Sequence, residues 1–160
     1  MHSLTFLIAL SLAAGPAATP SVDANAAFER LKKMEGSWKT DARDGPVQFV
    51  TLRVVAAGTA VLETTTAADR TTITSATVYS FEGSKLIATH HGSGGTSRLE
   101  LTGADPLAIK FDGTAKDARV AALALVVKQS KLRQEFTTRE SGRDVKKSLD
   151  LLSEYVDTLK

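Results

Sequence analysis

From residue 46 onward the hydrophobic positions fall in short runs of Thr, Val, Ile, Leu and Phe, which Gly, Asp and Ser interrupt about every ten residues. Short apolar runs between turn residues are typical of β-strands joined by tight turns. No long helical pattern separates the runs, and parallel strands would need crossovers of a dozen or more residues. The pattern therefore predicts about nine antiparallel strands, at residues 47–55, 59–66, 71–81, 85–91, 96–102, 108–111, 119–127, 131–138 and 143–152.

A different pattern precedes the strands, because apolar residues recur at steps of three and four between residues 24 and 34. This spacing is that of one face of an α-helix. Asp23 stands directly before it as a candidate N-cap, and Gly36 ends it. With a single apolar stripe over about three turns, the helix is predicted to cover the β domain as a lid or plug.

A sheet of this many strands protects its edges by closing into a barrel or by packing as a sandwich. The alternation in residues 132–136, with charged residues on one face, favours closure. The predicted fold is therefore all-β, a single antiparallel up-and-down barrel of about 8–10 strands with a short N-terminal helix. Residues 145–159 also fit a C-terminal helix; we predict strand for their first half and leave the tail open.

The N-terminal segment has the composition of a targeting sequence. Residues 1–18 contain no Asp, Glu, Lys or Arg, and their apolar run from Leu4 to Ala14 is shorter than the roughly 20 residues that span a bilayer. Small residues follow the run, as in a cleavable signal peptide. We expect residues 1–18 to be a signal peptide and residues 19–160 to form one periplasmic or secreted domain, without a membrane anchor after cleavage. A retained anchor or an N-terminal tail is the alternative.

Composition narrows the function classes. The chain has no Cys, which removes a disulfide framework and any site built on thiolates. Its 20 basic and 18 acidic residues give a net charge of +2, and no basic stripe interleaved with aromatics is present. A nucleic-acid partner is therefore not expected.

Several short motifs occur in an order that is similar to a family of secreted bacterial lipocalin-like proteins of unknown function, which have calycin-type barrels. A helix runs into Gly36-Ser37-Trp38, where the family has a Gly-x-Trp start of the first strand. Further on come residues 58–63, 78–86 and 89–91, where the family typically has Gly-x-Ala-x-x-Glu, Tyr-x-Leu-x-Gly-x-x-Leu and Thr-His-Tyr-Cys. The resemblance covers nearly the whole mature chain and implies a lipocalin-like barrel.

The chain also departs from the family pattern. His91-Gly92 replaces Tyr-Cys, and Thr96-Ser97-Arg98 stands where the family has Asn-Gln-Pro-Arg, after a loop shorter by one residue. Only His90 and Arg98 carry over from that part of the family site. Haem-binding relatives take a His from near the C-terminus, and this chain has none after His91, so no haem and no other cofactor are expected.

The candidate ligand-binding residues are polar or aromatic side chains expected at the barrel interior or its ends. His90 and His91 are adjacent on a strand and therefore face opposite sides, so we expect no metal site. His90 is expected inside, near the mouth, together with Arg98. A buried carboxylate needs a partner, and Arg98 and Arg53 are candidates for pairing with Glu63. The full set comprises Glu63, Tyr79, His90, Arg98 and Trp38, with an ordinary core role as the alternative for Tyr79 and Trp38.

These features support three functional hypotheses. The first is a non-enzymatic barrel that holds a small, mostly apolar ligand, for which alanines expected inside leave some space (Ala60, Ala76, Ala88, Ala122 and Ala124). The second is a protein-interaction or structural module with a filled barrel. The third and weakest is a hydrolase-like enzyme that uses His90 with Glu63 or Arg98. No catalytic residue is assigned, because no nucleophile motif such as Gly-x-Ser-x-Gly on a strand-to-helix turn occurs.

Overall fold

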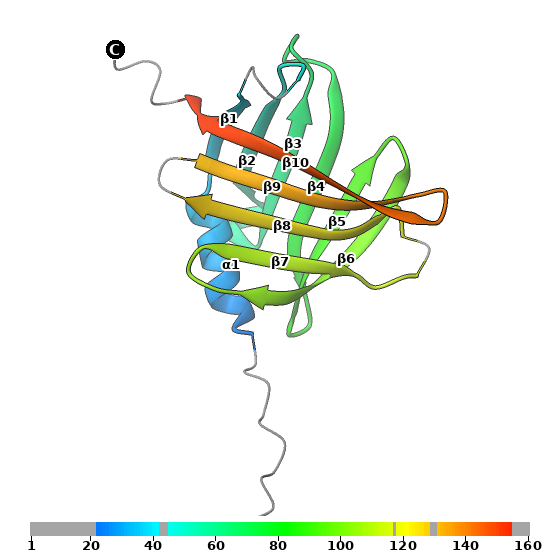
Figure 1. The fold of residues 1–160 in the computed structure, drawn as a ribbon. Helices are drawn as coiled ribbons and strands as arrows, with labels where there is room; N and C mark the ends of the chain where they lie inside the picture. Colours follow the sequence, from blue (N-terminus) through cyan, green and yellow to red (C-terminus); the bar gives the residue numbers. More distant parts are fainter. Residues whose placement is uncertain (1–21, 42–44, 117, 129–130, 155–160) are drawn as a thin grey trace, which may run out of the picture.

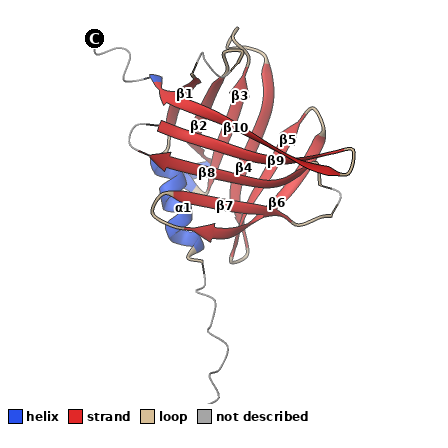
Figure 2. Cartoon of the chain, in the orientation of Figure 1, coloured by secondary structure: helices blue, strands red, loops and turns tan. Residues whose placement is uncertain are grey.

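The computed structural model describes residues 22–41, 45–116, 118–128 and 131–154, which form one α-helix and ten β-strands (Figures 1 and 2). Helix α1 spans Ala24–Lys33. A 3₁₀ turn, η2 (Ala56–Gly58), joins the second and third strands. The strands are β1 (Gly36–Thr40), β2 (Phe49–Val55), β3 (Ala60–Thr66), β4 (Ile73–Glu82), β5 (Lys85–Gly92), β6 (Gly95–Ala104), β7 (Ala108–Gly113), β8 (Val120–Lys128), β9 (Lys131–Glu140) and β10 (Arg143–Ser153).

Each strand pairs antiparallel with its neighbours along the chain, and β1 also pairs with β10, which closes the sheet into a barrel. The predicted all-β, up-and-down barrel is thus confirmed. The closing seam is short, because it joins only residues 38–40 of β1 to residues 151–153 of β10. By contrast, β10 pairs with β9 from Arg143 to Leu152.

The predicted strands correspond to β2–β10, and their ends differ by at most two residues. The tenth strand, β1, begins at Gly36, in the Gly-x-Trp sequence. The ambiguous C-terminal segment is strand as far as Ser153, so the strand prediction for its first half is confirmed. The predicted signal peptide lies outside the described residues, and so does the tail after residue 154.

Helix α1 closes one end of the barrel (left in Figure 1). Its predicted N-cap is confirmed, since Asp23 Oδ1 accepts a hydrogen bond from the Ala26 amide at 3.0 Å. The apolar stripe, with Phe28 and Leu31, is buried in the same core as the barrel side chains. Phe28 packs edge-on against Phe81 of β4, with ring centres 5.3 Å apart. The helix therefore acts as the plug that its single apolar stripe predicts.

Large apolar side chains fill much of the barrel. The rings of Tyr79 and Phe111 are fully buried and lie 5.5 Å apart. One continuous core surrounds them, with fully buried aliphatic side chains from β2 and from β5–β10: Leu52, Leu86, Leu99, Ile109, Leu123, Leu125, Leu132 and Leu151. A barrel of this size holds either packed side chains or one small ligand. Here packed side chains take most of the space.

The alanines expected to leave interior space do not all face inward. Ala88 is inside and fully buried. Ala122 and Ala124 lie on the outer face, where they line a surface hollow, because the larger Leu123 and Leu125 take the inward positions of β8. Ala76 alternates with the buried Thr77 in the same way. The expectation of interior space next to these three alanines was therefore wrong.

Candidate functional site

Four polar residues form a row across neighbouring strands inside the barrel. Glu63 of β3 lies opposite Thr77 of β4, and Thr77 lies opposite His90 of β5. His90 in turn lies opposite Ser97 of β6. All four are buried, with Glu63 2% exposed and His90 9% exposed. Because residues paired across strands lie side by side on one face, the strand register alone assembles this polar row.

Hydrogen bonds connect three members of the row, Glu63, Thr77 and His90, to one another and to Tyr79. The Tyr79 hydroxyl donates to Glu63 Oε2 at 2.9 Å. Thr77 Oγ1 donates to Glu63 Oε1 at 3.5 Å and lies 3.0 Å from His90 Nδ1. A hydroxyl can donate one hydrogen bond while it accepts another. Thr77 therefore links the buried carboxylate of Glu63 to the imidazole of His90.

Burial shifts the pKa values of the titratable groups in this row and of Tyr79 beside it. It raises the pKa of Glu63, and the hydrogen bond from Tyr79 opposes that rise only in part. Burial, together with the Glu63 carboxylate, also raises the pKa of Tyr79 well above its ordinary value. Burial lowers the pKa of His90, and the nearby His91 lowers it further. His90 is therefore a neutral imidazole at pH 7, and its Nε2 lies on the side of Gly92.

Gln134 of β9 is a second unusual polar residue of the interior. It is 0% exposed, and neither Nε2 nor Oε1 of its side chain has a hydrogen-bond partner among the described residues. The amide is near enough to Glu63 to lower that group's pKa, yet it does not reach hydrogen-bonding geometry. A buried polar group without a partner costs about 1–3 kcal/mol. The interior thus has hydrogen-bonding capacity that the protein leaves unused.

Replacing Gln134 with methionine is expected to raise the free energy of unfolding by about 1–2 kcal/mol, because an unpaired buried amide is removed while the side-chain length is kept. The two proteins are best compared at about pH 5, because the raised pKa of Glu63 favours its protonated form there. The Gln134 amide stabilises only the charged form of Glu63, so this effect contributes least at that pH. Urea titration measures the difference. A lower free energy of unfolding for the variant would show that the amide is satisfied in solution.

The end of the barrel opposite α1 has a hollow of about 160 Å³. It exposes the end of the polar row, since His90 and Ser97 line it together with the glycine-rich turn Gly92–Gly95. The charged side chains of Arg119, Glu140 and Lys147 also line it. At about 30 Å³ per water molecule, the hollow has room for roughly five waters or for an organic molecule of similar size. We call this space the mouth hollow.

Arg98 does not join the polar row. Its side chain is on the outer face, where Nη2 lies 2.6 Å from Glu82 Oε2. The tight turn between β5 and β6 sets a register in which Ser97 lies opposite His90, and Arg98 lies opposite Thr89. Because a one-residue change of register moves a side chain to the other face, the expectation that Arg98 faces the interior was wrong. The same register excludes Arg98 as the partner of Glu63, and Arg53 is also exposed.

The candidate Trp38 and the neighbouring His91 have local roles. Trp38 is half-buried against the core, and its Nε1 donates to the Met34 carbonyl at 3.2 Å, which ties the end of α1 to β1. His91 is exposed, and its Nδ1 lies 3.0 Å from Thr96 Oγ1. The expectation that His90 and His91 face opposite sides of the strand is therefore confirmed.

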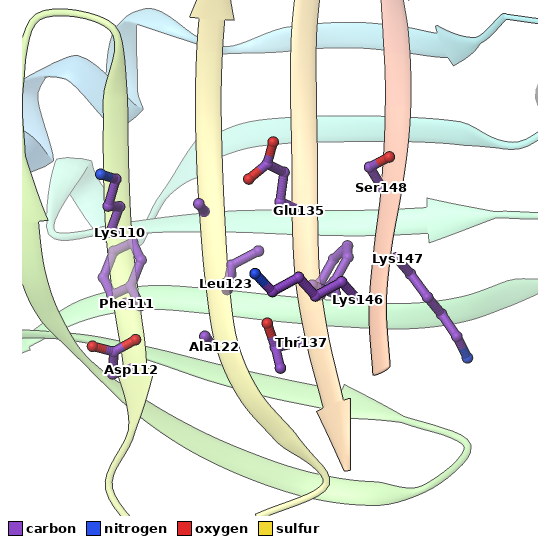
Figure 3. A pocket seen from close by; sticks show the side chains of 12 residues that line it. Lys110, Phe111, Asp112, Ala122, Leu123, Glu135, Thr137, Lys146, Lys147 and Ser148 are labelled. Atoms are coloured by element: carbon purple, nitrogen blue, oxygen red, sulfur yellow. The ribbon is translucent and has the colours of Figure 1, made fainter. Parts of the chain in front are cut away.

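A second hollow, of about 390 Å³, lies on the outer surface over β7–β10 (Figure 3). It exists because Ala122 and Ala124 of β8 are short, while longer side chains stand on the neighbouring strands. In Figure 3 the chain of Lys146 extends from β10 toward β8. The charged side chains that line this outer groove carry both signs: Lys110, Asp112, Glu135, Lys146 and Lys147.

Three residues of the site were not predicted as site residues, namely Thr77, Ser97 and Gln134. Ser97 lies in the polar row because the pairing of β6 with β5 places it opposite His90. Thr77 shares a strand face with Tyr79, and its place between Glu63 and His90 depends on the registers of two strand pairs. Gln134 stands between Leu132 and Phe136 on the predicted inward face of its strand, and this isolated polar position was the available signal.

Within the described residues, no group of three or more His, Asp or Glu side chains could hold a metal ion. In the same part of the chain, no helix has the length and apolar character needed to cross a membrane. In the comparisons with known proteins, no family model matches the chain, and no curated protein matches it.

Proposed function

We propose that this chain is a non-enzymatic, lipocalin-like binding protein of the periplasm or of the secreted fraction. It takes a small, mostly apolar ligand that carries one polar group. The ligand enters at the mouth hollow, and its polar group is placed by His90 at the end of the polar row.

The observation that carries the proposal is the meeting of a hollow with a buried polar row at one end of an otherwise apolar barrel. Ligand sites typically combine a concavity with a few converging polar groups. The lining of this hollow is polar apart from Val120 and the glycines of the turn, and the apolar core lies behind it. Here the concavity has room for a molecule of about five to six non-hydrogen atoms, and the neutral His90 ring beside it is fixed by Thr77 at 3.0 Å. The unpaired amide of Gln134 supports the same proposal, because it offers further hydrogen bonds deeper inside.

The experiment is a titration of the isotope-labelled protein with a panel of small organic acids, amides and alcohols, followed by NMR. Binding is expected to move the backbone signals of residues 90–97 and 119–120. His90→Phe keeps an aromatic ring but removes both ring nitrogens, so it is expected to abolish these shifts. His91→Phe is the matched control, because His91 is the next residue and faces outward. No shift with any compound, or equal shifts in both variants, would refute the proposal.

The filled interior favours a second candidate function, a protein-interaction or structural module. Tyr79, Phe111 and the aliphatic side chains around them occupy much of the space that a lipocalin-like ligand would need. A partner protein would then contact the outside, where the outer groove of Figure 3 offers a concavity of about 390 Å³. Signal changes confined to the outer groove on addition of a partner would favour this function.

The hydrolase-like alternative has less support. Arg98 faces outward, and Glu63 is 2% exposed, so a substrate in the mouth hollow meets neither of them directly. His90 contacts Thr77 instead.

A further inference from the structure

The cationic side chain of Arg119 lies at the rim of the mouth hollow and is held there by the turn beneath it. Arg119 packs across Gly94 so closely that a Cβ on Gly94 would lie 2.6 Å from both Cδ and Nε of Arg119. Real Cβ atoms essentially never approach other atoms this closely. The glycine is therefore what allows Arg119 to lie along the turn and reach the hollow.

Among the described residues, the guanidinium of Arg119 forms no hydrogen bond or ion pair. Glu140 is the carboxylate that lines the mouth hollow, and its Oε1 lies 2.6 Å from Lys147 Nζ. The hydrogen bond and charge of Lys147 lower the pKa of Glu140 most, the hydrogen bond from Thr138 lowers it further, and the charge of Arg119 adds to this without bonding to the carboxylate. The lining thus carries two cations and one anion, which leaves one positive charge.

Another hollow, on the other side of Arg119, also has a positively charged lining. It has a volume of about 400 Å³ and shares Gly94, Ser97 and Arg119 with the mouth hollow. Arg98 and Arg139 line it as well, and none of the described residues of its lining is acidic. Their partners, Glu82 and Asp144, do not belong to the lining. Charges of one sign around a concavity raise the local concentration of the opposite ion.

From this arrangement we propose that the ligand of the mouth hollow is a small carboxylate, with its anionic group on the guanidinium of Arg119 and its short carbon chain directed toward His90. The inference rests on the proposed function and names the chemical class of the ligand. A guanidinium presents a planar fork of N–H donors that matches the two oxygens of a carboxylate. The mouth hollow has room for about five or six non-hydrogen atoms of the ligand.

The test compares propanoate with propanamide, which have nearly the same shape and differ in charge. Both are titrated into the isotope-labelled full chain at low salt, because exposed charges are screened at high salt. Propanoate is expected to bind about tenfold more tightly than propanamide, as charge-assisted hydrogen bonds exceed neutral ones. It should shift the signals of residues 92–95 and the Nε–H signal of Arg119.

Three variants test whether the tighter binding of propanoate depends on Arg119. Arg119→Gln removes the charge and is expected to bring propanoate down to the affinity of propanamide. Gly94→Ala keeps the charge but displaces Arg119, and it should weaken propanoate in the same direction. Arg53→Gln is the control, because Arg53 is exposed on β2 and lines neither hollow.

Equal affinity for propanoate and propanamide, or unchanged propanoate binding in Arg119→Gln, would overturn the inference. Binding of neutral compounds that depends on His90 would then leave the proposed function intact. If no compound of the panel binds, the proposed function and the inference both fail.

Discussion

Replacing Phe111 with alanine should lower the free energy of unfolding by about 3–5 kcal/mol, the range found when large aromatic side chains are removed from well-packed cores. Phe111 is fully buried, and the centre of its ring lies 5.5 Å from that of Tyr79. The substitution would leave an apolar cavity in the middle of the barrel, and a small apolar compound such as benzene should restore part of the lost stability.

Urea denaturation measures this effect, and Leu107→Ala is the matched control. Leu107 precedes β7 and is 57% exposed, so its truncation is expected to change the free energy of unfolding by less than about 0.5 kcal/mol. A cost below about 1 kcal/mol for Phe111→Ala would mean that the ring has space around it in solution. That result would favour a ligand cavity inside the barrel over a filled interior.

Replacing Glu63 with glutamine should stabilise the protein increasingly as the pH rises. Burial raises the pKa of Glu63, so the folded state holds this proton more tightly than the unfolded state does. The contribution of the Glu63 proton to the free energy of unfolding is therefore fully present below the pKa of Glu63 in the unfolded chain, about 4.3. The wild-type protein loses stability as the pH rises toward the folded pKa. Glutamine cannot ionise, so the variant does not have this loss.

The expected gain at pH 7–8 is on the order of a few kcal/mol, the usual penalty for a buried charge whose hydrogen bonds only partly compensate it. Tyr79 can still donate its hydrogen bond to the glutamine carbonyl, so the substitution keeps the 2.9 Å contact. Urea titrations between pH 4 and 8 measure the difference. Glu100→Gln is the control, because Glu100 is an outward carboxylate paired with Lys85. A pH-independent difference between wild type and Glu63→Gln would show that Glu63 is solvated.

The fold was predictable because its signals are local. Strand runs, turn glycines and the stripe of α1 each lie within a dozen residues of sequence, and the predicted strands match β2–β10 to within two residues. Closure also followed from the number of strands and their alternation. The short β1 was the least visible strand, since only five residues from Gly36 to Thr40 form it.

The site was predictable only in part, because it depends on which face of its strand each side chain occupies and on which residues the strand pairing places side by side. Glu63, Tyr79 and His90 are inside, in one hydrogen-bonded group, and the sequence pattern placed each of them on an inward face. Arg98 was predicted on the wrong face, because the turn before it determines which residues of β6 face inward, and it places Ser97 opposite the inward His90. Thr77 joins the group through the pairing of β4 with β3 and β5, which a single chain pattern does not specify. Gln134 lies near Glu63 without a hydrogen bond to it, because the closed barrel brings β9 close to the polar row.

The short seam between β1 and β10 also determines when the barrel can form. Synthesis proceeds from the N-terminus, so β1 emerges first and its second edge has no partner until residues 151–153 of β10 follow. Contacts between residues so distant in sequence slow folding, since the loop between them must close before the contacts stabilise it. A nascent chain that stops before β10 has two open edges, one on β1 and one on β9. Closure of the barrel therefore follows the synthesis of its last strand.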